Sequence, residues 1–387
     1  MKMNLRQAVG SLLVVGLEGA ELTAQERAWL KLVRPAGVIL FRRNIVDTRQ
    51  TRALLDEAAS LCEANSFRCV DVEGGTVDRL RDALAPMPSA QAVAQATRRE
   101  YHTPTLSQRT RKDGAPSSFS PKSLARQHGE LIARGVRAFG FNTTLAPVLD
   151  LAQPDSASVM GTRAASATAA GVVAYARPFL AGLARHGVVG CGKHFPGLGG
   201  GAVDSHRSTP AIERASRELW RLDLAPYREL RDELPMVMVN HAAYPQTPGK
   251  NRPASVSRYW IQTVLRQRIG YRGIVFSDDL EMGGILKFMP IEEAAVAAIR
   301  AGMDLLEICH TPELILRAYE ALLAEGERSA AFGKLLLARA QQTARKRAKL
   351  FAGGGARALT EKQFAALRAH IQRFSEDVAE SQERQSA

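Results

Sequence analysis

Eight short apolar runs alternate with segments of helical periodicity, and this alternation constrains the fold more than any other feature of the chain. The runs are Leu12–Leu17, Gly37–Phe41, Arg68–Val72, Thr144–Leu149, Gly187–Gly190, Met236–Asn240, Gly273–Ser277 and Asp304–Cys309. Strands that alternate with helices pair in parallel through right-handed crossovers. An open doubly wound sheet commonly has about five to seven strands, whereas eight can close into a barrel. We therefore expect an α/β protein with a single-domain (β/α)8 barrel.

Segments with a helical period fill the intervals between these predicted strands. They include Thr48–Ala64, Ser123–Phe139, Ser166–His186, Ser216–Glu233, Ser255–Ile269 and Ile291–Ala301. The sequence Thr-Ala-Gln-Glu that ends at Glu26 has the form of a capping box, which predicts the start of an early helix. Gly187, Gly270 and Gly302 stand where three of the helices should end.

Polar residues follow the ends of several predicted strands. They are Asp71 and Glu73, Asp150, Lys193 and His194, Asn240 and His241, Asp278 and Asp279, and His310. The active site of a (β/α)8 barrel is built from the loops at the C-terminal ends of its strands. These residues therefore favour the closed barrel over the open sheet.

Two segments do not follow the alternating pattern. A stretch at about 97–121, rich in Ser, Thr, Arg and Pro, predicts a basic surface insertion. We expect a barrel domain over residues 1–350 and a C-terminal helical extension with a polar tail over residues 351–387. The chain becomes polar after Arg373, which predicts a frayed end over Glu376–Ala387.

The formal net charge of +13 is compatible with nucleic acid, an anionic membrane surface or an anionic substrate as a partner. The basic residues are not gathered into one aromatic-interleaved patch but cluster in Arg98–Lys122 and Arg345–Lys349, which favours solvated faces. No apolar run approaches the roughly 18 residues of a membrane-spanning helix. The first apolar run, Leu12–Leu17, fits a strand better than a secretory signal because no A-x-A-type cleavage site follows it.

The four cysteines have no C-x-x-C spacing, and each falls in or beside an apolar segment. They are Cys62, Cys69, Cys191 and Cys309. This usage predicts buried free thiols in a reducing compartment, and hence a cytoplasmic location.

The glycine-rich stretch Cys191–Pro210 carries a lysine, two histidines and an aspartate, which predicts a functional site. Within it, Asp204 lies close enough to His206 to orient and charge the imidazole. The residues Gly197–Ala202 also match the dinucleotide fingerprint G-x-G-x-x-G/A. A true fingerprint opens a helix, and Pro210 follows too soon for one, so we reject a dinucleotide cofactor.

Asp278 and Asp279 directly follow a predicted strand and form the strongest acidic candidate. A carboxylate at a strand end can be a nucleophile, a general base or a metal ligand. The alternative is a helix cap, which suits Asp279 better. A metal would need further ligands, and Asp71, Glu73 and Asp150 could supply them.

Asp71 and Arg79 form a second candidate pair. Asp71 could accept hydrogen bonds from two neighbouring sugar hydroxyls, and Arg79 could donate to the sugar or hold Asp71 in place. From spacing alone, a structural ion pair is the simpler interpretation. Arg163 is open to the same two interpretations.

Five ordered motifs resemble those of glycoside hydrolase family 3. They are VDVEGG with a following DR (70–79), LAPVLDL (145–151), KHFPG with a following DSH and TP (193–210), MVNHAAYP (238–245) and FSDDLEM (276–282). The DSH loop is similar to that of the β-N-acetylglucosaminidase (β-hexosaminidase) branch, which serves peptidoglycan recycling. The resemblance runs from about Leu12 to about Leu323. It implies a TIM-like barrel, a retaining mechanism and no metal or other cofactor.

The resemblance also implies roles for individual residues. Asp278 matches the catalytic nucleophile, His206 the acid/base, and Asp204 the partner of that histidine. The positions that bind the N-acetylglucosamine ring are matched by Asp71, Arg79, Arg163, Lys193 and His194. Leu198 departs from the pattern, because the family usually has a second histidine there, and glycines replace the Asp-Thr that follows.

These matches predict removal of non-reducing β-linked N-acetylglucosamine from muropeptide-like fragments. The alternatives are a family 3 phosphorylase, a β-glucosidase-like hydrolase, and a non-catalytic barrel that binds sugar or nucleic acid. As partners we expect a small carbohydrate substrate and no nucleic acid, with no membrane span and with the chain acting as a monomer.

Overall fold

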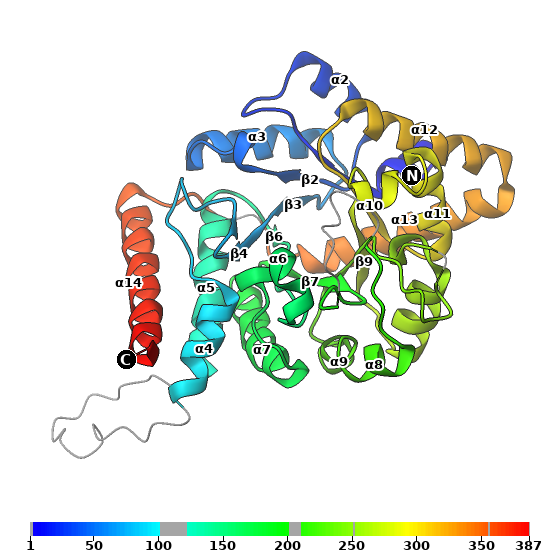
Figure 1. Ribbon diagram of the computed structural model, residues 1–387. Coiled ribbons are helices and arrows are strands. Elements are labelled where there is room, and N and C mark those ends of the chain that lie inside the picture. Colours follow the sequence, from blue (N-terminus) through cyan, green and yellow to red (C-terminus); the bar gives the residue numbers. More distant parts are fainter. Residues whose placement is uncertain (1–2, 101–121, 201–209, 251, 355–356, 387) are drawn as a thin grey trace.

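The computed structural model describes residues 3–100, 122–200, 210–250, 252–354 and 357–386 (Figure 1). Within these residues, eight parallel strands close into a barrel in the order β1-β10-β9-β8-β7-β6-β3-β2. Their bounds are β1 Leu13–Gly16, β2 Gly37–Leu40, β3 Phe67–Val70, β6 Thr143–Thr144, β7 Val189–Phe195, β8 Met236–Val239, β9 Ile274–Asp279 and β10 Leu305–Ile308. Each overlaps one of the predicted apolar runs, so the predicted (β/α)8 barrel is confirmed. A short antiparallel hairpin, β4 (Val72–Gly74) with β5 (Val77–Asp78), extends from the end of β3.

The barrel closes between the first and last strands, where Leu13 pairs with Leu306. Alternate residues of β10 belong to different apolar clusters. Leu305 and Cys309 join a small cluster made mainly by strand residues, whereas Leu306 and Ile308 join the large cluster that includes the helices. Because side chains alternate across a strand, the small cluster is the barrel interior and the large one is the layer between strands and helices.

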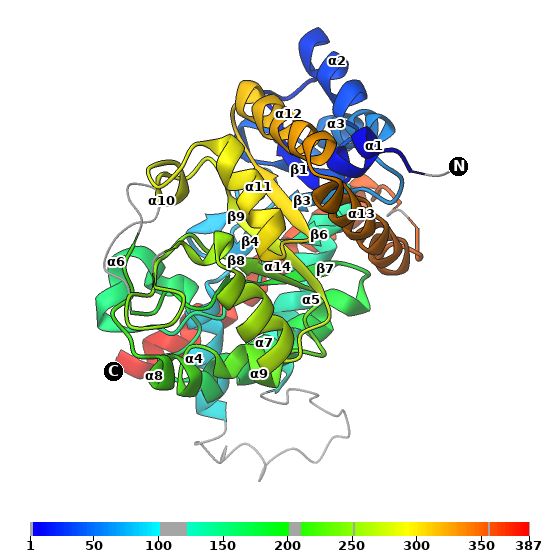
Figure 2. The same ribbon diagram turned by 90° about the vertical axis from the view of Figure 1, so that its right-hand side faces the viewer.

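Helices surround the barrel (Figures 1 and 2). The longer ones are α2 Ala24–Val33, α3 Thr48–Leu61, α4 Ala90–Glu100, α5 Lys122–Ala138, α7 Ala169–Arg185, α11 Ile291–Ala301, α12 Pro312–Arg328, α13 Ala330–Leu350 and α14 Glu361–Ser386. The remaining helical segments are α1 Leu5–Gly10, η1 Arg42–Asn44, η3 Pro154–Ser156, α6 Ala157–Met160, η4 Gly161–Arg163, α8 Ser216–Arg221, α9 Ala225–Glu229, η5 Ala254–Val256, η6 Tyr259–Arg268 and α10 Gly283–Leu286. In Figure 2, α6 and α10 lie on the left, beyond the C-terminal strand ends, and α1 and α13 lie on the right.

Local signals placed several helix ends correctly. The predicted capping box opens α2, since the Glu26 N–H donates to Thr23 Oγ1 at 3.1 Å and the Thr23 N–H donates to Glu26 Oε2 at 2.8 Å. Gly302 follows α11 with a φ of 118°, in the left-handed region that favours glycine. These interactions satisfy backbone groups that a helix end otherwise leaves unpaired.

Two predicted helices differ from the structure. The segment Ser216–Glu233 divides into α8 and α9, and Pro226 lies in the first turn of α9, where its missing N–H is tolerated. The segment Ser255–Ile269 begins its helix only at Tyr259, and that helix, η6, is a π-helix. Apolar periodicity does not distinguish the i→i+5 bonding of a π-helix from that of an α-helix.

The C-terminal helix α14 continues to Ser386 and packs against α4 and α5 (Figure 1). The predicted frayed end over Glu376–Ala387 is therefore wrong for most of its length. The reason is that Phe374 and Val378 are buried, which carries the apolar face past the point where the composition turns polar. Most of the predicted basic insertion at about 97–121 lies outside the described residues.

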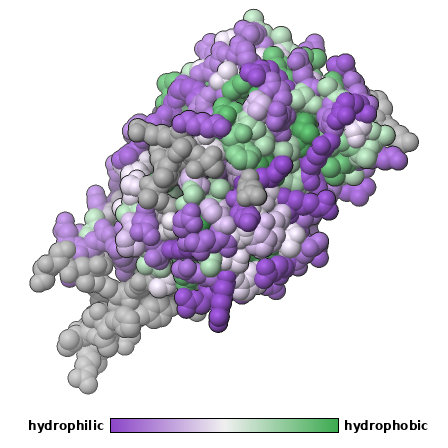
Figure 3. Space-filling view, turned by 45° about the vertical axis from the view of Figure 1, so that its right-hand side comes forward, coloured by the Kyte–Doolittle hydropathy of each residue, from purple (hydrophilic) through white to green (hydrophobic). Residues whose placement is uncertain are grey.

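Hydrophilic residues dominate the face of the molecule shown in Figure 3, with smaller apolar areas between them. Among the described residues, the large apolar side chains that stand exposed are Leu32, Val46, Phe288 and Leu359. Across the described helices, none combines the length and apolar character that crossing a membrane requires.

Candidate active site

A cavity of about 180 Å³ lies at the C-terminal end of the barrel and is lined by residues from the strand ends. Six of the predicted site residues line it together: Asp71, Arg79, Arg163, Lys193, His194 and Asp278. They come from segments spread over more than half of the chain, and closure of the barrel brings them together. The predicted acid/base pair, Asp204 and His206, lies outside the described residues.

A buried group of charges forms one wall of this site. Lys193 Nζ lies 2.8 Å from Asp71 Oδ1 and 2.7 Å from Glu73 Oε1. Arg163 donates two hydrogen bonds to Glu73, both at 2.8 Å. The side chains of Lys193 and Glu73 are only 4% and 2% exposed, so solvent screens these pairs weakly.

The pKa values of this group follow from its geometry. Burial alone would raise the pKa of Glu73, but the charges and hydrogen bonds of Arg163 and Lys193 lower it well below its usual value. Burial alone would lower the pKa of Lys193, but Asp71 and Glu73 raise it above its usual value. Glu73 and Lys193 are therefore ionised at neutral pH, and their charged atoms are held in fixed positions.

His194 is held by Asp150. The Asp150 carboxylate lies 2.6 Å from His194 Nδ1 and also accepts the backbone N–H groups of His194 and Leu198, at 3.1 and 2.7 Å. Since a carboxylate accepts, Nδ1 carries a proton. The other ring nitrogen, Nε2, lies 3.4 Å from Arg163 Nη2 at the cavity. Asp150 thus fixes the orientation of His194 and also anchors the start of the glycine loop.

Two of the possible metal ligands are instead engaged in ion pairs and hydrogen bonds within the protein. The carboxylates of Glu73 and Asp150 are directed at cations and N–H groups. No set of three or more His, Cys, Asp and Glu side chains is arranged to hold a metal ion in the part of the chain that the structure describes.

Arg79 reaches the cavity from the end of the hairpin β4–β5. Its backbone N–H donates to the Asp71 carbonyl at 3.0 Å, and its Nη2 lies 4.0 Å from Asp71 Oδ2. The guanidinium also lies over the Phe41 ring, 5.7 Å from its centroid. Arg79 is therefore both an ion-pair partner of Asp71 and a cavity residue, so the two interpretations of the pair are compatible.

Asp278, at the end of β9, is partly exposed to the cavity. The Asp279 N–H donates to its Oδ1 at 3.0 Å. Burial alone would raise the pKa of Asp278, but His194, His241, this N–H and Lys193 lower it below its usual value. Asp278 is therefore an ionised carboxylate with access to a bound ligand.

The neighbouring Asp279 has the opposite electrostatic character. Its Oδ1 accepts the N–H groups of Glu281 and Cys309, at 3.0 and 3.2 Å. Burial, assisted by the charges of Glu281 and Asp278, raises its pKa to about 8. It does not cap the following helix, since the N-cap of α10 is Met282. Two adjacent carboxyl groups are thus driven to different protonation states, as is common at functional sites.

Several residues that build the site were not among the predicted sugar-binding residues. Glu73 connects Lys193 to Arg163, and its position two residues after Asp71 was the available signal. Glu307 and His310 line the cavity. The signal for Glu307 was a charged residue within an otherwise apolar strand.

The departure at Leu198 is accommodated without disturbing these contacts. Leu198 is buried and lines the cavity, and its backbone makes the bond to Asp150. The preceding Gly197 has a φ of 134°, and a Cβ there would lie 2.6 Å from Asp223 Cβ. Glycine is therefore required where the loop leaves β7.

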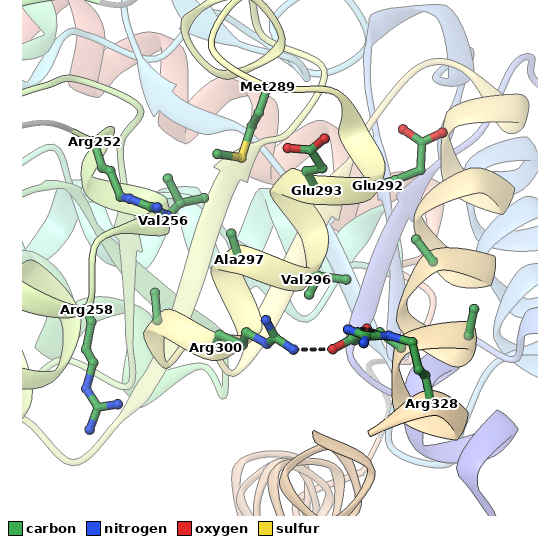
Figure 4. Close-up of a pocket in the computed structure, with 14 residues that line it drawn as sticks. Arg252, Val256, Arg258, Met289, Glu292, Glu293, Val296, Ala297, Arg300 and Arg328 are labelled. Carbon is green, nitrogen blue, oxygen red and sulfur yellow. Dashed lines mark hydrogen bonds and ion pairs between the residues drawn. The ribbon is translucent and has the colours of Figure 1, made fainter. Parts of the chain in front are cut away.

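A wider cavity, of about 750 Å³, lies outside the barrel between α11 and α12 (Figure 4). Its walls carry alanines and arginines, and Arg300 on α11 pairs with Glu325 on α12 across it. None of the residues from the strand ends lines this outer cavity. The chemistry therefore belongs to the smaller cavity, although the outer one is larger.

Comparison with known proteins identifies similar sequences. The family model described as "Glycosyl hydrolase family 3 N terminal domain" matches residues 4–336. A protein of Alkalilimnicola ehrlichii named "Beta-hexosaminidase" is 38% identical over 304 residues, which cover 78% of this chain and 82% of that protein.

Solved structures share the architecture. One is a glycoside hydrolase family 3 beta-N-acetylglucosaminidase from Paenibacillus sp. str. FPU-7, with a TM-score of 0.80 and 30% identity over 96% of this chain and 69% of that one. Another is NagZ from Neisseria gonorrhoeae in complex with N-trifluoroacetyl-D-glucosamine, with a TM-score of 0.71 and 29% identity over 95% of this chain and 98% of that one.

Proposed function

The chain belongs to glycosyl hydrolase family 3, and from this premise we propose that it is a retaining β-N-acetylglucosaminidase that removes non-reducing terminal N-acetylglucosamine. Its relatives named beta-hexosaminidase support the activity, as does the similar structure that holds N-trifluoroacetyl-D-glucosamine. The observation that carries the proposal is Asp278, an ionised carboxylate that faces a cavity walled by fixed hydrogen-bonding groups.

In the proposed mechanism, Asp278 attacks C1 of the sugar while the bond from C1 to the leaving oxygen breaks. A carboxyl ester between Asp278 and the sugar results, which is the covalent intermediate of a retaining glycosidase. We assign His206 as the acid that protonates the leaving oxygen and then as the base that takes a proton from the attacking water. Asp204 would orient His206 and stabilise its cation. An unperturbed histidine titrates near pH 6.5, which suits both steps at neutral pH.

The remaining cavity residues are assigned to binding. The carboxylate of Asp71 can accept hydrogen bonds from sugar hydroxyls, because Lys193 and Arg79 hold its orientation from the other side. Arg163 and His194 lie together at the adjacent wall, where the Arg163 guanidinium can donate to the sugar and His194 Nε2 can accept from it. Fixed groups that hold the reacting atoms in place can lower an activation barrier by up to roughly 7–11 kcal/mol.

Asp278→Asn tests the proposal. We expect it to lower kcat on an aryl β-N-acetylglucosaminide by about four orders of magnitude, because the neutral amide cannot form the ester. Asp82→Asn is the matched control, since that side chain is 73% exposed and does not line the cavity. Near-wild-type activity of the Asp278 variant would reject the assigned nucleophile.

A slow fluorinated sugar provides an independent test. It should trap the covalent intermediate, and proteolysis should place the label on the peptide Phe276–Met282. A label elsewhere would contradict the mechanism. Product analysis with and without inorganic phosphate separates hydrolysis from phosphorolysis. We expect free sugar in both, since Lys193, Arg163 and Arg79 are each already paired with a carboxylate.

We further propose that the substrate is a peptidoglycan fragment and that the protein acts in the cytoplasm as a monomer. Cys62, Cys69, Cys191 and Cys309 are all free and buried, which fits a reducing compartment. Light scattering on the purified protein tests the monomer, and muropeptide digests analysed by mass spectrometry test the substrate class.

A further inference from the structure

Glu307 occupies an unusual position in the middle of β10. It lies on the same face of the strand as Leu305 and Cys309, which belong to the apolar interior of the barrel. Its exposed fraction is 3%. Its Oε1 is buried and has no hydrogen-bond partner among the described residues.

A buried carboxyl group without a partner is costly. Leaving a buried polar group unsatisfied destabilises a protein by about 1–3 kcal/mol. Folded proteins satisfy most such groups, and the exceptions concentrate at sites of function. Glu307 lines the same cavity as Asp71 and Asp278. A ligand in that cavity can therefore supply the partner that the protein does not.

The surroundings of Glu307 also determine its protonation state. Burial raises the pKa of Glu307 well above its usual value, and the charges of Asp71, Asp279 and Asp278 raise it further, against a smaller opposing effect of Lys193. A raised pKa favours the carboxylic acid form of Glu307, which has one O–H donor and a carbonyl acceptor. That pair of functions is complementary to a hydroxyl group, which accepts one hydrogen bond and donates another.

We propose that Glu307 is a substrate-binding residue on the floor of the cavity, where its O–H donates a hydrogen bond to a hydroxyl oxygen of the non-reducing sugar. The inference rests on the proposed function, since it takes a sugar to be the occupant of the cavity. It adds a specificity determinant, because a site built to bond a hydroxyl discriminates against sugars that lack it.

The test compares Glu307→Leu with Glu307→Gln, measuring the affinity for N-acetylglucosamine by calorimetry and Tm in its absence. The Leu variant should bind the sugar about tenfold more weakly, because it removes one hydrogen bond from a buried site. Its Tm should rise, because an unpartnered polar group is replaced by an apolar one. The Gln variant retains a donor and an acceptor and should bind within about threefold of wild type.

Leu305→Ala is the matched control, since Leu305 lies on the same face of β10 but does not line the cavity. It should lower Tm and leave the sugar affinity unchanged. The proposal is overturned if Glu307→Leu binds like wild type, or if that variant lowers Tm and affinity together. Wild-type enzyme that neither cleaves the aryl glycoside nor binds the sugar would instead reject the proposed function.

A series of monodeoxy N-acetylglucosamines gives a test that does not depend on the variant folding. One analogue should bind wild type about tenfold more weakly than the parent sugar and should bind Glu307→Leu with no further loss. If no analogue weakens binding to wild type, the hydrogen bond to a hydroxyl is rejected.

Discussion

At the scale of single residues, the site depends on how its charges are paired. Glu73 pairs with both Lys193 and Arg163 in a region that solvent hardly reaches, so these pairs differ from those on the surface. Buried pairs are costly to form but even more costly to break, because the remaining partner is left as an isolated charge. Lys193 also donates a hydrogen bond to Asp71, so these pairs fix the orientation of the Asp71 carboxylate as well.

Removing the charge of Glu73 should therefore destabilise the fold. We expect Glu73→Gln to lower the free energy of unfolding by about 3 kcal/mol, measured by urea denaturation. The matched control is Glu57→Gln, which breaks the exposed pair with Arg27 and should cost less than about 1 kcal/mol. Equal losses for the two variants would contradict the view that burial makes the Glu73 pairs different.

Asp279 should give the stability a specific pH dependence. Its pKa of about 8 in the folded state exceeds the unfolded value near 3.9, so between these values the folded state holds more protons. Stability is then lost as pH rises through this window, by up to about 1.4 kcal/mol per pH unit. Between pH 6 and pH 8 the wild type should lose free energy of unfolding that Asp279→Asn retains, so the difference between the two should shift in favour of the variant. The exposed-site variant Asp82→Asn should show no such shift.

At the scale of elements, sequence patterns predicted the features that depend on local sequence, namely the strands and one helix start. The eight apolar runs each became a barrel strand, and the capping box opened α2 where expected. The patterns did not reveal which side chains meet, because Lys193 and Asp71 are 122 residues apart in sequence. Nor did they predict η6 or the full length of α14, since hydrogen-bond pattern and tertiary packing set those features.

The helix α14 supports a proposal for the domain organisation. We propose that residues 1–350 form the barrel domain and that 351–387 form an extension that is part of the same cooperative unit. In support, Phe374 is buried and stacks on His128 of α5, with ring centroids 5.9 Å apart.

Truncating that contact tests the proposal. Phe374→Ala should lower the free energy of unfolding by about 3–5 kcal/mol while unfolding stays a single transition. Glu376→Ala, on the exposed side of the same helix, should change it by less than about 0.5 kcal/mol. Two separate transitions in the wild type would indicate that α14 unfolds on its own.

At the scale of the whole molecule, the net charge of +13 should affect the rate at which charged substrates bind rather than the fold. A strongly positive protein attracts anions over distances comparable with the Debye length. Peptidoglycan fragments carry carboxylates, whereas a neutral aryl glycoside does not. The long-range field should therefore act on one substrate class and not on the other.

Ionic strength separates these cases. Between about 10 mM and about 500 mM salt, kcat/KM should fall several-fold for an anionic muropeptide and stay constant for a neutral aryl glycoside. Tight, salt-sensitive binding of DNA by a protein without glycosidase activity would instead support a nucleic-acid-binding barrel.

The pairing of Lys193 with Asp71 and Glu73 has one more consequence. Lys193 belongs to β7, and Asp71 and Glu73 belong to the segment after β3. They therefore come together only when β7, β6 and β3 have paired in the barrel. A ligand that requires the assembled groups binds the native state alone and stabilises it by mass action. During refolding, affinity for the sugar should therefore appear when β3, β6 and β7 pair with one another. A substrate analogue would then report on folding as well as on catalysis.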